Sequence, residues 1–189
     1  MKTKLLILPI VLLFTVAGLA QSNVALSLHT GYTMSAFSEF EEKGLVDDAP
    51  LIGFNVGYEL LKGLELGGGF NYVIGGFKFE MEDDEGSFTL KWEYILIGLY
   101  GKYSLNSGSF NPFVKVGVGY FLGDNIIELE GVENSFEVDN GIGFIFGGGI
   151  QHSSGIFAEF NYNIVTRNYF NEDFDMNTWA VFIGYHIKR

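Results

Sequence analysis

The sequence predicts an all-β fold, an eight-stranded antiparallel up-and-down transmembrane β-barrel that is preceded by a cleaved signal peptide. Three observations lead to this prediction. Apolar residues recur at every second position in eight segments of the chain. The positions between them are rich in glycine, asparagine and charged residues. Each segment has roughly the ten residues that a tilted strand needs to cross a bilayer.

The N-terminal residues have the pattern of a secretory signal. Lys2 and Lys4 precede an uncharged, mostly apolar run, and small residues stand at 18 and 20, three and one before the expected cut. The run is shorter than the roughly 20 residues that a spanning helix needs. We therefore expect residues 1–20 to be removed after Ala20, and residues 21–189 to form one barrel domain.

The strands are assigned from alternation with a period of two. In each segment one set of alternate positions holds large aliphatic and aromatic residues, and the other holds small or polar ones. The fourth segment is the least regular, because both of its faces are partly apolar. The eight segments are 24–32, 51–60, 64–79, 92–103, 112–123, 142–152, 156–165 and 178–187.

The polarity of the two faces predicts which one meets lipid. A narrow closed barrel has space inside for glycine and short polar residues, so the large apolar residues face outward. A secreted soluble barrel that holds an apolar ligand would need an aliphatic inner face, and the sequence does not offer one. This assignment predicts that Val116→Arg destabilises the barrel far more than Gly117→Ser.

The connections between segments also alternate in character. The three-residue connections 61–63 and 153–155 are tight, and 80–87 and 104–111 are of medium length. The connections 33–50, 124–140 and 166–177 are long, and these three and 80–87 are predicted to be external. Outer-membrane barrels have short periplasmic turns and longer external loops. The four connections predicted to be external carry 19 of the 23 acidic residues: Glu39, Glu41, Glu42, Asp47, Asp48, Glu80, Glu82, Asp83, Asp84, Glu85, Asp124, Glu128, Glu130, Glu133, Glu137, Asp139, Glu172, Asp173 and Asp175.

Composition excludes several classes of function. The chain has no cysteine, which excludes a disulfide scaffold, a thiolate metal site and a cysteine nucleophile. Its net charge of −12 argues against nucleic acid as a partner. His152 stands beside Ser153 and Ser154, but this group falls in a tight turn and is read as a polar turn cluster. No catalytic site, cofactor or metal is predicted, and we expect no enzyme activity.

With this pattern, the chain resembles the small eight-stranded outer-membrane β-barrel proteins of Gram-negative bacteria, in particular the porin-like barrels common in Bacteroidetes. The resemblance rests on the Ala20–Gln21 junction and on the segments 94–103 and 179–187. It implies a location in the outer membrane, contact with its lipid and lipopolysaccharide, and insertion by the barrel-assembly machinery. It also implies a monomer.

The inward-phase charges are the candidate site. They fall in the half of the barrel near the tight turns, where an unpaired charge in a narrow lumen is costly and carboxylate–cation pairing is expected. The predicted lumen ion-pair network comprises Glu59, Glu65, Lys102, Lys115, Glu159 and His186.

The sequence leaves the function open between two main alternatives. In the first, the barrel has a structural or adhesive role, displays acidic external loops and has a lumen plugged by side chains and ion pairs. In the second, it is a narrow or gated channel that passes ions or small solutes. The acidic loops could also bind divalent cations, although Glu82–Glu85 lacks the ligand spacing of a defined calcium loop.

Overall fold

The computed structural model describes residues 23–35, 48–74, 77–83, 86–105, 108–129, 132–137, 140–169, 172–175 and 177–188. The predicted signal peptide and the acidic positions 39–47 lie outside them. Among the described residues, no helix is long and apolar enough to cross a membrane. The strands are β1 (Val24–Ser35), β2 (Asp48–Leu61), β3 (Leu64–Val73), β4 (Phe77–Asp83), β5 (Gly86–Ser104), β6 (Phe110–Leu129), β7 (Val132–Glu137), β8 (Gly141–His152), β9 (Ile156–Tyr169), β10 (Glu172–Asp175) and β11 (Thr178–Lys188).

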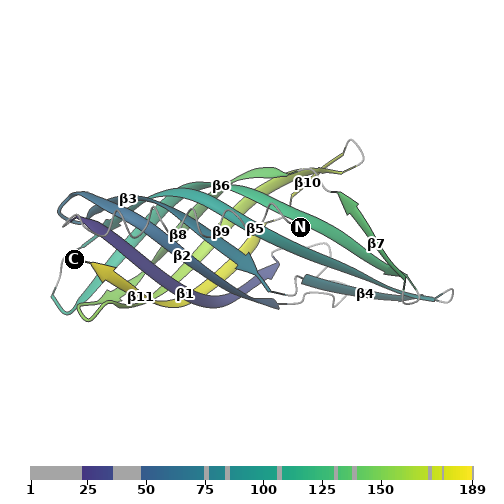
Figure 1. Cartoon of the computed structure of the whole chain (residues 1–189), viewed down its shortest axis with the longest axis horizontal. Coiled ribbons are helices and arrows are strands. Elements are labelled where there is room, and N and C mark those ends of the chain that lie inside the picture. The colour runs from purple at the N-terminus through teal and green to yellow at the C-terminus, as the bar shows by residue number, and fades with distance from the viewer. Residues whose placement is uncertain are drawn as a thin grey trace.

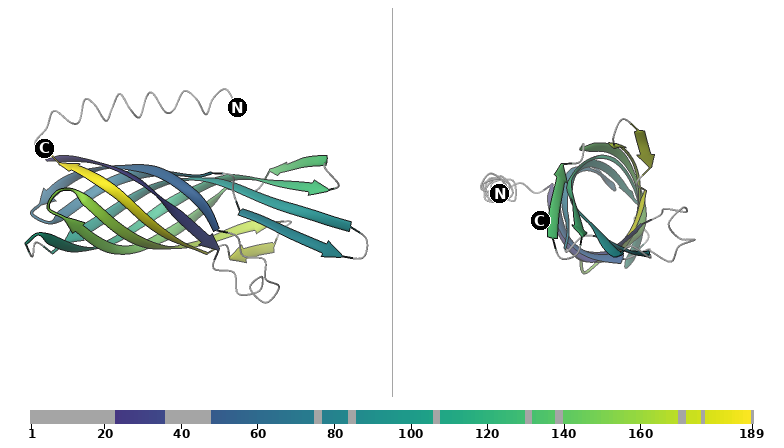
Figure 2. Two further views of the ribbon diagram at one scale, coloured as in Figure 1. Left: turned by 90° about the horizontal axis from the view of Figure 1, so that it is seen from below. Right: turned by 90° about the vertical axis from the view of Figure 1, so that its right-hand side faces the viewer.

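The barrel is a ring of eight antiparallel strands, as predicted. Its order is β1-β2-β3-β5-β6-β8-β9-β11, and β1 closes the ring by pairing with β11 from Ala25↔Lys188 to Ser35↔Thr178. The strands tilt around the barrel axis in Figure 1, and the end-on view in Figure 2 shows the closed ring. Closure gives every barrel strand two hydrogen-bonded neighbours, so no edge of the ring faces lipid.

The two ends of the barrel differ. At one end β2 joins β3, β5 joins β6 and β8 joins β9 through short connections, and β1 begins and β11 ends there. Gly63 and Gly155 have φ of 85° and 98° in these turns, a conformation that side chains other than glycine rarely adopt. We call this the short-turn end. The opposite, long-hairpin end carries projecting strands (Figure 2).

Exposure confirms which face of each strand points outward. The outward-phase residues Leu28, Val116 and Ile183 are 53%, 56% and 60% exposed, whereas the inward-phase Leu51 and Phe121 are 2% and 3% exposed. The same alternation recurs on the other barrel strands and is weakest on β3, where most positions are of intermediate exposure. Large apolar side chains therefore form the outer surface of the ring, as lipid contact requires.

The connections at the long-hairpin end correct the sequence prediction. Residues 80–87, 124–140 and 166–177 were expected to be loops, but they contain β4, β7, β10 and the outer parts of β5, β6 and β9. The expected strand 64–79 is divided, because β3 ends at Val73 and β4 starts at Phe77, and Gly75–Gly76 lies between them. Backbone pairing continues past the apolar band because bilayer thickness limits only the apolar part of a strand.

Candidate functional site in the barrel lumen

The lumen side chains change in chemistry along the barrel axis. Toward the long-hairpin end, buried apolar side chains from seven strands pack together. We call this cluster the apolar layer. Its residues are Ala49, Leu51, Val73, Tyr94, Leu96, Phe121, Ile145, Val165, Ala180 and Phe182.

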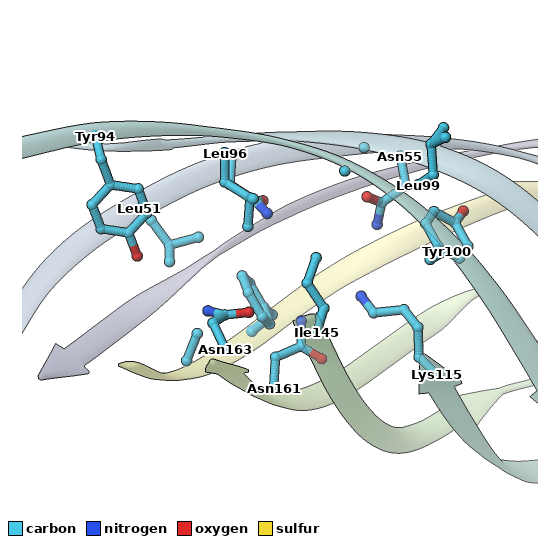
Figure 3. Close-up of a pocket in the computed structure, with 15 residues that line it drawn as sticks. Leu51, Asn55, Tyr94, Leu96, Leu99, Tyr100, Lys115, Ile145, Asn161 and Asn163 are labelled. Atoms are coloured by element: carbon cyan, nitrogen blue, oxygen red, sulfur yellow. The ribbon is translucent and has the colours of Figure 1, made fainter. Parts of the chain in front are cut away.

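Four asparagines line the inner wall beside the apolar layer: Asn55 on β2, Asn71 on β3, and Asn161 and Asn163 on β9. They border a cavity of about 30 Å³ that also touches Tyr100 and Lys115. Figure 3 shows Asn161 and Asn163 beside Ile145, with Tyr94 and Leu51 on one side of them and Lys115 on the other. In the described part of the chain, the Oδ1 atoms of Asn161 and Asn163 are buried without a hydrogen-bond partner. The space is comparable to that needed by one or two water molecules.

Nearer the short-turn end, Glu65 on β3 is the centre of a charged cluster. Lys102 Nζ lies 3.1 Å from Glu65 Oε2, and their side chains are 10% and 9% exposed. The two residues are direct cross-strand partners in the β3–β5 register. Tyr100 donates a hydrogen bond from its hydroxyl to Glu65 Oε1 over 2.8 Å. A Cβ atom at Gly57 would lie only 2.7 Å from Glu65 Cγ. The absence of a side chain at Gly57 therefore leaves space for the Glu65 carboxylate.

Lys115 and Glu159 form the second ion pair, although β8 lies between their strands. The β8 residues paired with them are Gly147 and Gly149, respectively. A Cβ at Gly149 would lie 3.0 Å from Glu159 Cα and 2.7 Å from the Phe113 ring. Because these inward positions carry no side chain, the lysine and the glutamate can meet across β8.

Aromatic rings connect the two pairs. Lys115 Nζ lies 5.4 Å from the centre of the Tyr100 ring, and Tyr100 in turn donates to Glu65. Lys102 Nζ lies 5.4 Å from the Phe113 ring. A cation over an aromatic face is stabilised by the negative charge density of the ring. The two lysines face each other in the β5–β6 register, and each is turned toward its own carboxylate.

His186 joins the cluster across the closing seam. Its Nε2 lies 3.9 Å from Glu65 Oε2, and its Nδ1 is hydrogen-bonded to Ser27 Oγ over 2.7 Å. Ser27 and His186 are register partners on β1 and β11. A second cavity, of about 10 Å³, is lined by members of this group, including Ser27, Lys102, Glu159 and His186.

The structure thus brings together five of the six residues singled out from sequence. Glu59 lies at the β2–β3 turn, where its Oε1 accepts a hydrogen bond from the Gly63 backbone N–H over 3.0 Å. Sequence reasoning missed Tyr100 and Ser27 as members of the cluster. The inward phase of both residues is a signal in the sequence, as is the place of Tyr100 near Lys102, but a neutral hydroxyl does not itself indicate an ion-pair network.

The arrangement offers few features of a catalytic or metal centre. Among the described residues, no group of three His, Asp or Glu side chains could hold a metal ion. His152 Nδ1 is hydrogen-bonded to Ser154 Oγ over 2.9 Å within its turn. Ser27 and His186 make a serine–histidine contact, but both are buried, at 6% and 7% exposure. A hydrolase would also need substrate access and donors for an oxyanion.

Comparison with known proteins identifies the family. The family model described as outer membrane protein beta-barrel domain matches residues 6–186. The chain belongs to this family. It is a barrel of the outer membrane of a Gram-negative bacterium, in contact with the lipid of that membrane. No curated protein sequence matches it.

Solved structures with a similar fold are small outer-membrane barrels. Neisserial surface protein A gives a TM-score of 0.58 at 12% identity, covering 88% of this chain and 97% of that one. Ail, the attachment invasion locus protein of Yersinia pestis, gives 0.51 at 14% identity, covering 88% and 100%. The outer membrane enzyme PagL gives 0.47 at 12% identity, covering 87% and 99%. In such barrels the short turns are periplasmic and the long connections extracellular.

Proposed function

We propose that this protein is a surface-interaction barrel, a membrane anchor whose extracellular hairpins make the functional contacts. One observation carries the proposal: β5 and β6 continue beyond the barrel, where β4 and β7 pair with them to make a four-stranded sheet. Figure 2 shows these hairpins projecting past the barrel mouth. Strands that only crossed the membrane would not need this extension.

In this proposal the lumen is a structural plug. The apolar layer lies nearer the long-hairpin end of the lumen. The charged cluster of Glu65, Lys102, Lys115, Glu159 and His186 lies nearer the short-turn end. The cavities near them are of the size of a few water molecules. The competing function is a narrow or gated channel in which the ion pairs rearrange. It is favoured by one observation, that both cavities touch Asn55, Tyr100 and Lys115.

The remaining parts of the proposal follow from the family and the sequence. We propose a non-enzymatic monomer that contacts lipopolysaccharide and is inserted by the barrel-assembly machinery after removal of residues 1–20. The acidic external segments, whose side chains lie outside the described residues, are proposed to set the charge of the contact surface.

A pair of variants separates the two functions. The register partners Phe77 and Trp92 can be joined by an Asn-Gly turn, and so can Asn125 and Phe136, which removes the projecting sheet and keeps the barrel. The control is Glu65→Gln with Lys102→Met, which alters the lumen alone. Cells that express each form are tested for adhesion to mucin-coated and collagen-coated surfaces, and the purified proteins for conductance in planar bilayers.

We expect the shortened form to lose adhesion while it still shows heat-modifiable migration on a gel, and the lumen variant to adhere like the wild type. If neither coating retains more wild-type cells than cells without the protein, or if the shortened form adheres equally well, the proposal is wrong. Steady wild-type conductance would favour the channel.

A further inference from the structure

Two buried amide groups at the cavity beside the apolar layer lack part of their hydrogen bonding. In the described part of the chain, the Oδ1 atoms of Asn161 and Asn163 have no hydrogen-bond partner. Both residues line the cavity, and they are only 4% and 3% exposed. A buried carbonyl oxygen without a donor is costly, and for this reason such groups in native proteins are nearly always paired.

The amide of Asn163 is oriented by a neighbouring strand. Its Nδ2 donates a hydrogen bond to Thr178 Oγ1 over 2.9 Å, which leaves Oδ1 as the unpartnered end. If this amide were turned over, its NH2 group would lack the partner instead. In both orientations one polar atom of Asn163 is left for a guest in the cavity to satisfy.

Lys115 supplies a hydrogen-bond donor at the same cavity. Its ammonium group has three N–H donors, and Glu159 Oε1 accepts one of them. Figure 3 shows the Lys115 nitrogen pointing toward Asn161 and Ile145. Glu159 borders the second, smaller cavity, so that among the described residues Lys115 is the one charged side chain that lines the first.

These groups define the chemistry of the guest. A cation would be repelled by Lys115 and would find no carboxylate on the described wall of the cavity. An anion would meet two amide oxygens, which can only accept hydrogen bonds. A water molecule can donate to both oxygens and accept from the ammonium group. The cavity volume of about 30 Å³ holds one or two such molecules.

We propose that this cavity binds one or two water molecules that link Lys115 to Asn161 and Asn163. The bound water extends the charged cluster to the asparagine side chains and ends at the apolar layer. Val165 belongs to that layer, is 2% exposed and does not line the cavity. Water therefore reaches Ile145 at the cavity wall but not Val165. The proposal goes beyond the surface-interaction function and does not depend on it.

The test is the transfer of magnetisation from water to methyl groups, measured by NMR on the full mature protein in lipid nanodiscs with labelled isoleucine and valine methyl groups. Ile145 and Val165 both belong to the apolar layer, but only Ile145 lines the cavity. We expect a cross-peak between water and the Ile145 methyl group and none at Val165. One spectrum thus contains the site and its internal control.

A double variant shows whether the amide groups hold the water. Asn161→Leu with Asn163→Leu removes both amides at nearly constant side-chain size, and we expect it to abolish the Ile145 cross-peak. Tyr100 and Lys115 also line the cavity, carry exchangeable protons and remain in this variant. A cross-peak relayed by their protons would persist, whereas one that comes from bound water would be lost.

Asn23→Leu is the matched control, because Asn23 is exposed and lies outside the cavity, and it should leave the cross-peak unchanged. Each variant must retain heat-modifiable migration, which shows that the barrel is folded. If the double variant does not fold, the comparison of Ile145 with Val165 in the wild type still decides the proposal.

A cation in the cavity is the competing outcome. We expect the urea midpoint of the wild type to be the same in sodium, potassium and choline chloride at equal concentration. A higher midpoint in sodium or potassium that the double variant loses would show a cation site and overturn the proposal. The proposal is also refuted if the wild type gives no cross-peak at Ile145 or an equal one at Val165, or if the cross-peak persists in the double variant.

Discussion

Removing the charge of Glu65 tests whether the lumen depends on its ion pairs. Glu65→Gln keeps the size of the side chain and an oxygen that can accept from Tyr100, but it leaves the Lys102 ammonium without its carboxylate at 3.1 Å. Both side chains are about nine-tenths buried, so solvent screens little of the loss. Leaving one partner of a buried pair uncompensated costs about 3–5 kcal/mol.

The double variant separates charge from packing. Glu65→Gln with Lys102→Met removes both charges and keeps the volume, so we expect its unfolding free energy to return to within about 1 kcal/mol of the wild type. Glu59→Gln is the matched control. Glutamine can still accept from the Gly63 N–H, so the expected loss is about 1 kcal/mol or less.

The assay is urea unfolding of the barrel in lipid vesicles, followed by tryptophan fluorescence and by the folded band on an unheated gel. With a slope of about 2 kcal/mol per molar urea, the single variant should unfold at about 2 M less urea. The reasoning fails if the double variant is as unstable as the single one, or if Glu65→Gln unfolds with the wild type.

Three further outcomes are expected. Val116→Arg should cost about 2–4 kcal/mol in the vesicle assay, because Val116 faces lipid, and Val116→Leu should be tolerated; equal losses would contradict that orientation. Gly117→Ser should destabilise the barrel more than Gly101→Ser. A Cβ at Gly117 meets the Leu99 carbonyl and lies 3.2 Å from Tyr100 Cβ, whereas at Gly101 the nearest atom is Leu66 Cδ2 at 3.4 Å. The reverse order of urea midpoints would refute this reasoning. In planar bilayers the wild type should show no large steady channel, and Lys102→Ala with Lys115→Ala should add small, noisy openings; a wild type that conducts steadily would exclude the plug.

Much of the fold could be predicted from the sequence, because lipid and lumen impose opposite demands on successive residues. Leu28 and Val116 fall outside and Leu51 and Phe121 inside, as their phase indicates. The prediction that Gly117→Ser destabilises far less than Val116→Arg rests on phase alone, and the structure adds a steric cost at Gly117. Alternation places Gly117 in the lumen, but it says nothing of the neighbouring carbonyl that a Cβ would meet.

The candidate site was harder to predict, because the phase of a residue on its strand fixes the direction of its side chain but not which partner that side chain contacts. The lysine–glutamate pair of Lys115 and Glu159 requires contact across an intervening strand, and this depends on glycines at Gly147 and Gly149. Glu59 has the same inward phase as Glu65, yet its Oε1 accepts from the turn backbone. The roles of Ser27 and Tyr100 depend on hydrogen-bond partners, His186 and Glu65, that only the folded barrel brings to them.

The projecting sheet of β4, β7 and the outer parts of β5 and β6 was not predicted, although its residues alternate with a period of two. Alternation in residues 77–93 and 124–137 indicates strands as clearly as it does within the barrel, but the density of carboxylates suggested loops. A lipid-facing strand must be apolar on its outer phase, so polar residues there mark the membrane boundary, between Glu93 and Ile95 on β5 and between Leu122 and Asp124 on β6. Beyond that boundary water favours polar residues on the same phase. The β5–β6 register continues across the boundary without a shift, so the alternation of residues 86–93 and 124–129 continues that of the barrel strands.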